Sequence, residues 1–139
     1  MRDLRYGIEI EMTGLSRGKA AETLAGFFGT RAEHTGGGYD AYAVRDAQDR
    51  VWKLVSDGSI QTQKKVRGQT VAADSTYSVE LVSPVCVYED IETIQEIVRA
   101  LRRNSALVND SCGIHVHVGA EKFDAQHLRN ICLLYTSDA

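Results

Sequence analysis

The sequence predicts one α+β domain in which helices cover one face of a β-sheet. Three segments alternate apolar and polar residues at the two-residue repeat of a strand, and they lie at 6–12, 77–82 and 113–119. Two other segments repeat their apolar residues at helical spacing, one after Ser16 and one after Asp90. The length of 139 residues allows one domain with a hydrophobic core and is too short for two ordinary domains.

The first predicted strand, Tyr6–Met12, has one apolar face and one acidic face. Its apolar residues point to one side, which we expect to be the core, while Glu9 and Glu11 point to the other. A helix should follow, because Ser16 is a favourable N-cap and Gly29 a favourable stop at its end. The chain therefore begins with a strand and an amphipathic helix.

The middle of the chain predicts a hairpin and then a long loop. Gly36–Gly38 is a break, and the segments 39–44 and 50–55 read as two strands joined by a polar turn. Residues 58–74 are polar with little periodicity, so we predict a loop there. Compact domains seldom keep loops of this length unless they are functional, and this one could close over a substrate or nucleotide.

The second half of the chain repeats the arrangement of the first. The strand predicted over Tyr77–Val82 places Glu80 opposite its apolar face, and the helix that begins at Asp90 should cover the apolar side of the sheet. Asp124 should cap a further helix. The strand between these two helices turns its apolar residues inward and its histidines to the other face, with Ile114, Val116 and Val118 opposite His115 and His117.

Composition excludes several classes of partner. A net charge of -3 argues against nucleic acid, and the one short basic cluster, Lys64, Lys65 and Arg67, reads as a solvated loop. No apolar run is long enough to span a membrane. The N-terminus lacks the apolar stretch of a signal peptide, so we expect a cytoplasmic protein. The cysteines predict neither a disulfide framework nor a zinc site, because Cys86, Cys112 and Cys132 form no even set and no C-x-x-C pair.

The acidic and histidine-bearing faces predict one divalent-metal site. Glu9 and Glu11 share a strand face, where sharing a hard cation would relieve their repulsion. His115 and His117 also share a face, where neutral imidazoles bind metal and imidazolium ions neutralise phosphate. Each motif alone has a plainer reading, since strands commonly carry charged residues on a solvated face and Glu80 alone would most often be a surface residue. Together they point to a site that handles the phosphates of a nucleotide.

The ordered set of motifs resembles the amidoligase family of the glutamine synthetase and glutamate–cysteine ligase superfamily. The motifs are Tyr6–Glu11, Asp57–Ser59, Glu80–Pro84 and Gly113–Gly119. The resemblance implies an antiparallel sheet of the glutamine synthetase type with helices on one face. It also implies two or three Mg²⁺ ions, with Mn²⁺ as an alternative, that bind ATP. Such an enzyme phosphorylates a carboxylate so that an amine displaces phosphate and forms an amide or isopeptide bond.

The resemblance also implies roles for particular residues. Glu9 and His115 would serve the metal beside the terminal phosphates. The other metal, nearer the acyl substrate, would be held by Glu11 and by Glu80, which therefore also counts as catalytic. His117 would contact the phosphate being transferred and is the second catalytic candidate. Two further residues, Asp57 and Ser59, would lie near the substrate and nucleotide, although a D-G-S element is equally typical of a simple turn. The partners would be small-molecule or peptide carboxylates and amines, and the sequence does not indicate an oligomeric state.

The end of the chain departs from the family pattern. The family also uses a later glutamate and arginines beyond the histidine strand, and residues 120–139 offer no match for them. Residues 132–139 resemble the translation of an adapter used in sequencing libraries, and the helix pattern begun at Asp124 changes at about Ile131. We therefore expect residues 1–131 to be the N-terminal part of one catalytic domain, 132–139 to be a non-native tail, and this chain alone to be inactive.

Two other functions stay open at this level. One is a zinc-dependent hydrolase, in which the His-x-His pair and a glutamate hold zinc and activate water. The other is a noncatalytic remnant that binds metal or nucleotide. Three glutamates beside two histidines favour a hard, oxygen-preferring ion over zinc.

Overall fold

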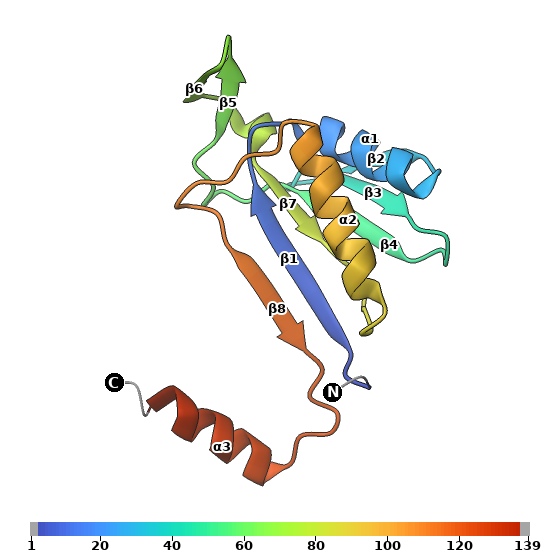
Figure 1. Cartoon of the computed structure of the whole chain (residues 1–139), viewed down its shortest axis with the longest axis vertical. Helices are drawn as coiled ribbons and strands as arrows, with labels where there is room; N and C mark the ends of the chain where they lie inside the picture. The colour runs from blue at the N-terminus through green and yellow to red at the C-terminus, as the bar shows by residue number, and fades with distance from the viewer. Residues whose placement is uncertain (1–2, 137–139) are drawn as a thin grey trace.

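The computed structural model describes residues 3–136 and confirms an α+β fold built on a six-stranded antiparallel sheet (Figure 1). The strand order is β2-β3-β4-β7-β1-β8, so β1, the first strand of the chain, pairs with two strands from its second half. The strands are β1 (Tyr6–Met12), β2 (Ala32–Gly36), β3 (Ala41–Arg45), β4 (Val51–Val55), β7 (Val79–Val82) and β8 (Ile114–Val118).

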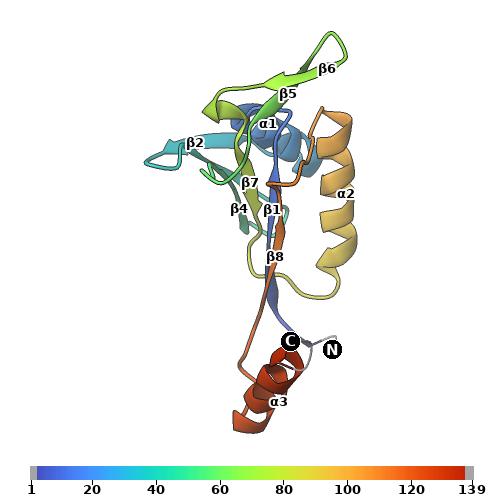
Figure 2. The same ribbon diagram turned by 90° about the vertical axis from the view of Figure 1, so that its left-hand side faces the viewer.

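Two helices, α1 (Arg17–Phe28) and α2 (Asp90–Arg103), cover one face of the sheet. The edge-on view shows α2 along one side of the strands (Figure 2). The predicted caps of α1 are confirmed, since the hydroxyl of Ser16 accepts a hydrogen bond from the Lys19 amide and Gly29 adopts the left-handed conformation. Both helices therefore begin where the sequence predicts.

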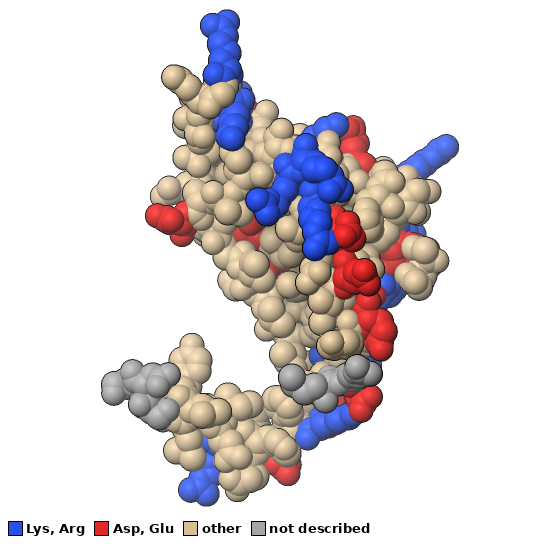
Figure 3. All heavy atoms as spheres, viewed as in Figure 1, with Lys and Arg blue, Asp and Glu red and all other residues tan. Residues whose placement is uncertain are grey.

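The charges of α2 follow its dipole. Asp90 and Glu92 lie in its first turn, and Arg102 and Arg103 lie in its last. In the space-filling view, acidic side chains line the lower part of this helix and basic side chains gather over its upper end (Figure 3). The apolar stripe faces the opposite way, with Ile94, Ile97 and Leu101 buried.

The hydrophobic core lies between this helix layer and the apolar face of the sheet. The alternation predicted for β1 is confirmed, because Ile10 and Met12 are 8% and 4% exposed. The core also contains residues of α1, β3, β4 and β7, including Leu24, Val44, Trp52, Leu54, Val79 and Leu81. Because successive strand residues point to opposite faces, burying these side chains directs the intervening polar ones to the other face of the sheet.

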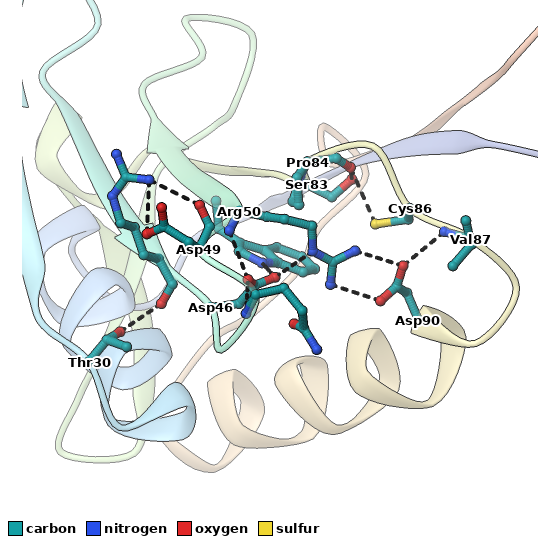
Figure 4. Close-up of polar contacts among 12 residues, drawn as sticks. Thr30, Asp46, Asp49, Arg50, Ser83, Pro84, Cys86, Val87 and Asp90 are labelled. Atoms are coloured by element: carbon teal, nitrogen blue, oxygen red, sulfur yellow. Dashed lines mark hydrogen bonds and ion pairs between the residues drawn. The ribbon is translucent and has the colours of Figure 1, made fainter.

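An ion-pair network fixes the turn between β3 and β4 to the start of α2 (Figure 4). The Arg50 guanidinium donates two parallel hydrogen bonds of 2.9 Å to Asp90 and one of 2.8 Å to Asp46. Asp46, whose side chain is 2% exposed, also accepts from the indole of Trp52 at 3.1 Å. The buried carboxylate is therefore paired and hydrogen-bonded, as a buried charge must be.

The prediction of a loop over 58–74 is wrong, because this segment contains a hairpin. Its strands are β5 (Gln63–Val66) and β6 (Gln69–Ala72), and Arg67 and Gly68 turn the chain with φ of 50° and 79°. β6 and the hairpin's tip are exposed, so burial imposes no apolar alternation there for a periodicity argument to detect. The basic cluster lies on this hairpin, and Lys and Arg side chains project around the top of the molecule in Figure 3.

Three strands of the large sheet also differ from the prediction, one because it was missed and two because they begin later. β2 was not predicted, since its residues are mostly polar and exposed and it contains a bulge between His34 and Gly36. β3 begins at Ala41 rather than residue 39, after a turn. Tyr77 belongs to a 3-10 turn, η1 (Ser75–Tyr77), so β7 begins only at Val79.

β8 forms an edge of the sheet, and the prediction that its apolar residues point into the core is wrong. Ile114, Val116 and Val118 are 64%, 57% and 49% exposed. They lie on the helix side, but the buried core does not extend to this edge of the sheet. A strand's alternation gives its two faces but not whether the protein covers them.

The helix α3 (Ala125–Thr136) follows β8 and lies away from the sheet (Figure 1). Its predicted cap is confirmed, because the Asp124 carboxylate accepts a hydrogen bond of 2.9 Å from the His127 amide. The expectation that the helix ends near Ile131 is wrong, because the helix continues to Thr136. Residues 137–139 of the proposed tail lie outside the described residues.

Two sequence-based expectations concern cysteines and membranes. Cys86 and Cys112 are free thiols, as predicted. Within residues 3–136, none of the helices combines the length and apolar character needed to cross a bilayer.

Candidate functional site

The polar face of the three strands at one end of the sheet carries all five side chains first predicted for a metal site. In the register of the sheet, Glu11 of β1 pairs with Glu80 of β7, and Glu9 of β1 pairs with His115 of β8. His117 follows on the same face of β8. The shared face results from the alternation that buries Ile10 and Met12 on the other side.

Three carboxylates gather at one end of this face. Glu11, Asp57 and Glu80 each offer an oxygen within 4.8 Å of the other two. Asp57 follows the end of β4, and the register places Glu80 opposite the last residue of that strand. Glu11 is only 5% exposed, and one of its oxygens accepts a hydrogen bond of 2.7 Å from the Gly113 amide. Like charges this close require a proton, a cation or strong hydrogen bonds between them.

The electrostatics of these carboxylates reflect their crowding. Burial, a hydrogen bond with Asp57 and the charges of Glu9, Asp57 and Glu11 raise the pKa of Glu80 to about 7. The pKa of Asp57 is lowered instead, first by the Ser59 amide and then by the Ser59 hydroxyl, both 2.8 Å from one carboxylate oxygen. Below a pH of about 7, Glu80 therefore carries a proton that relieves part of the repulsion.

Glu9 lies between the two histidines at the other end of the same face. One of its oxygens is 3.3 Å from Nδ1 of His115, and the other is 3.2 Å from Nε2 of His117. The hydrogen bond with His117 is the largest cause of a lowered pKa for Glu9. The histidine side chains are 55% and 66% exposed, so this end of the site is open to a ligand.

A cavity of about 410 Å³ adjoins the open end. Glu9 and His117 line it together with Ser83 and Pro84 from the segment after β7. Gly7, also in its lining, is the residue that pairs with His117, and a side chain there would meet no atom within 4 Å. At Gly7 the cavity is therefore lined by bare backbone, which a ligand can approach closely.

The donor set fits a hard divalent cation. Mg²⁺ and Mn²⁺ prefer carboxylate oxygens, and Glu11, Asp57 and Glu80 supply three such groups within reach of one ion. Glu9 and His115 supply a carboxylate and an imidazole beside it. The chemistry of these groups therefore fits two ions on one sheet face.

The structure brings every predicted site residue into this region, although not in the predicted arrangement for all. Ser59 contacts the other side chains only through Asp57. Asp57, predicted beside the nucleotide or substrate, lies beside the carboxylates of Glu11 and Glu80. The sequence does show that Asp57 comes just after the end of a predicted strand. Placing Asp57 near Glu80 would also have required knowing that this strand, β4, pairs with β7.

Fold and site together define a protein that carries carboxylates and histidines on one face of an antiparallel sheet. The family described as "Putative amidoligase enzyme" matches residues 2–138. The chain therefore belongs to the amidoligase family. A search of the curated proteins and one of the solved structures found no match.

Proposed function

We propose that this protein serves ATP-dependent ligation of a carboxylate to an amine. The observation that carries the proposal is the pairing of Glu11 with Glu80 and of Glu9 with His115 on one sheet face, in a member of the amidoligase family. Ligation through an acyl phosphate requires that negative charge be neutralised at two places, the phosphates of the nucleotide and the acyl group. The Glu9 and His115 pair would serve the first place, and the Glu11 and Glu80 pair the second.

Each cluster would hold one divalent ion. Glu11, Asp57 and Glu80 would hold the ion on the acyl side, which extends the sequence-based assignment by Asp57. Glu9 and His115 would hold the ion on the nucleotide side. Bound Mg²⁺ would supply positive charge that offsets the negative charge of the phosphates and of the acyl group.

The remaining groups would orient the reactants. The terminal phosphoryl group of ATP passes to an oxygen of the carboxylate substrate and ADP leaves. The amine nitrogen then attacks the acyl carbon, releases phosphate and loses a proton. His117 would donate a hydrogen bond to the phosphoryl oxygens, and the adjoining cavity lined by Glu9 and His117 would receive the nucleotide. The bare backbone at Gly7 would allow close approach there.

Binding is the direct test of this proposal. We expect Mg²⁺-dependent binding of a nonhydrolysable ATP analogue in calorimetry, with Glu9→Gln weakening it at least tenfold. The exposed Glu33 of β2 gives a matched control, and Glu33→Gln should bind as the unchanged protein does. Binding that ignores Mg²⁺ and Glu9 would refute the proposal. The separate expectation that this chain alone is inactive is contradicted if it releases ADP when given ATP, carboxylates and amines.

A zinc-dependent hydrolase is the second candidate, because Glu9 lies within 3.3 Å of both His115 and His117. Two imidazoles and one carboxylate are a common catalytic zinc set. The neighbouring cluster of Glu11, Asp57 and Glu80 favours the ligase, since oxygen-only sites prefer harder ions. Hydrolysis that requires zinc and no nucleotide would decide for the hydrolase.

A further inference from the structure

Arg17, at the first position of α1, is a buried charge that hydrogen-bonds to two segments, one at Asp40 and one at Ser75–Ser78. Its side chain is 5% exposed. One guanidinium nitrogen donates to the carbonyl oxygens of Ser75 and Ser78 at 2.6 and 2.7 Å. The others donate to the Asp40 carbonyl at 3.2 Å and to its carboxylate at 2.6 Å. Because a buried guanidinium must keep its partners, it fixes the chain from Ser75 to Ser78 at the entry to β7.

Ser78 passes this constraint to Asp57. Its hydroxyl accepts a hydrogen bond of 2.9 Å from the Asp57 amide and donates one of 2.6 Å to the Asp57 carbonyl. Both backbone polar groups of Asp57 are thus bound to one side chain, which is itself 3% exposed. Ser78 also lies two residues before Glu80. The segment 78–80 therefore carries the Glu80 carboxylate and also holds the backbone of Asp57.

Apart from Ser78, the only backbone restraint on Asp57 among the described residues is a longer hydrogen bond of 3.3 Å that its carbonyl accepts from the Ile60 amide. The Asp57 carboxylate lies near those of Glu11 and Glu80, and like charges at this separation repel. The segment that contains Asp57 is not part of a strand, so sheet pairing does not fix it. Ser59 orients the carboxylate and Ser78 fixes the backbone beneath it.

We propose that Ser78, held in place by Arg17, is a positioning residue that sets Asp57 as the third ligand of the ion site formed with Glu11 and Glu80. The inference rests on the proposed function, since it presumes that a cation binds there. Outer-shell partners of metal ligands are worth about 10–100-fold in affinity. Their removal leaves the ligand in the protein but no longer fixed in place.

The test is Mn²⁺ binding to the complete chain, measured by calorimetry and by the loss of the free Mn²⁺ paramagnetic signal. The component that Glu80→Gln removes identifies the carboxylate site. We expect Ser78→Ala to weaken that component about 10–100-fold. Arg17→Lys, which keeps the charge but cannot contact Asp40 and the two carbonyl groups at the same time, should weaken it less. The circular dichroism spectra should stay unchanged.

Thr13 provides a closely matched control. Its hydroxyl, which is also buried, accepts from the Gln63 amide at 2.8 Å and donates to the Gln63 carbonyl at 3.0 Å. Thr13→Val removes the same double contact six residues beyond Asp57 while preserving side-chain volume. We expect it to lower stability about as much as Ser78→Ala, by about 1 kcal/mol, and to leave the Mn²⁺ component within twofold.

The outcomes separate the two proposals. Wild-type affinity in Ser78→Ala, while Glu80→Gln removes a component, would overturn the positioning role and leave the ion site intact. Equal weakening by Thr13→Val and Ser78→Ala would also overturn it, because general loosening would then explain both. If no Mn²⁺ component depends on Glu80, the ion site fails and the inference fails with it.

Discussion

Replacing Glu80 with glutamine should stabilise the ion-free protein and remove the stabilisation that comes from an ion at the cluster of Glu11, Asp57 and Glu80. Burial is the largest cause that raises the pKa of Glu80 to about 7. The nearby carboxylates of Asp57 and Glu11 also contribute to this rise. A glutamine side chain has nearly the same shape, carries no charge and can donate a hydrogen bond to Asp57 as the protonated acid does. The variant therefore imitates the protonated form at every pH.

The sign and size follow from proton linkage. The pKa of Glu80 is higher in the folded protein than its ordinary value of 4.5, so the folded state binds the proton more tightly. Its contribution to stability is complete below pH 4.5 and is lost as the pH rises through about 7. Each pKa unit corresponds to about 1.4 kcal/mol. Because Glu80 is only partly buried and solvent screens its neighbours, we expect a loss of roughly 2 kcal/mol.

At pH 8.5 the ion-free Glu80→Gln protein should therefore be more stable than the wild type by roughly 2 kcal/mol, or about 6 °C in Tm. At pH 4.5 the two proteins should be nearly equal. Mg²⁺ or Mn²⁺ should reverse the order at high pH, since an ion at the Glu80 cluster binds the folded wild type but not the variant and stabilises the wild type by mass action. A stabilising substitution that destroys ligand binding is typical of functional sites.

Urea denaturation followed by circular dichroism, with and without Mn²⁺, measures these differences from pH 4.5 to 8.5. The exposed Glu33 provides the control, because Glu33→Gln makes the same chemical change on the outer strand β2 and should show neither the pH dependence nor the ion effect. If Glu80→Gln destabilises the ion-free protein at pH 8.5, or if the wild type is equally stable at both pH values, the reasoning about the carboxylate cluster is incorrect.

Three other substitutions test the fold and the open end of the site. Asp46→Ala should cost about 3–5 kcal/mol in urea denaturation, since it leaves the buried indole N–H of Trp52 without its acceptor and removes a buried ion-pair partner. Gly14→Ala should greatly reduce the yield of folded protein on expression, because the glycine has φ of 88° and a Cβ would overlap the backbone of a neighbouring loop. His117→Ala should raise the pKa of Glu9 toward its ordinary value, since the His117 hydrogen bond is the largest cause of its lowering. Carboxyl NMR titration measures that change, and an unchanged Glu9 titration would show that the hydrogen bond does not form in solution.

The sequence predicted best those elements whose two faces differ. β1 runs from Tyr6 to Met12 as predicted, and α1 begins after Ser16 and ends before Gly29. Both elements pack one face against the core and leave the other more exposed, so burial imposes a period on the sequence. Caps act through hydrogen bonds within a few residues, which makes them readable without tertiary information.

The errors fall where burial imposes no period. The exposed strands of the 63–72 hairpin and the polar strand β2 carry no alternation to detect, so they were predicted as loop or missed. The apolar residues of β8 are assigned correctly to one face but incorrectly to the core. Periodicity distinguishes faces, whereas exposure depends on what else packs there.

For the candidate site, the sequence by itself determined which side chains share a face within each strand, because a two-residue repeat fixes that locally. Glu9 and Glu11 on β1, and the two histidines on β8, needed nothing more. Only the tertiary structure decided which strands are neighbours, and hence that Glu11 faces Glu80 and that Asp57 joins them. Strand order depends on contacts between residues far apart in the chain, and no local pattern encodes which of the possible pairings buries the core.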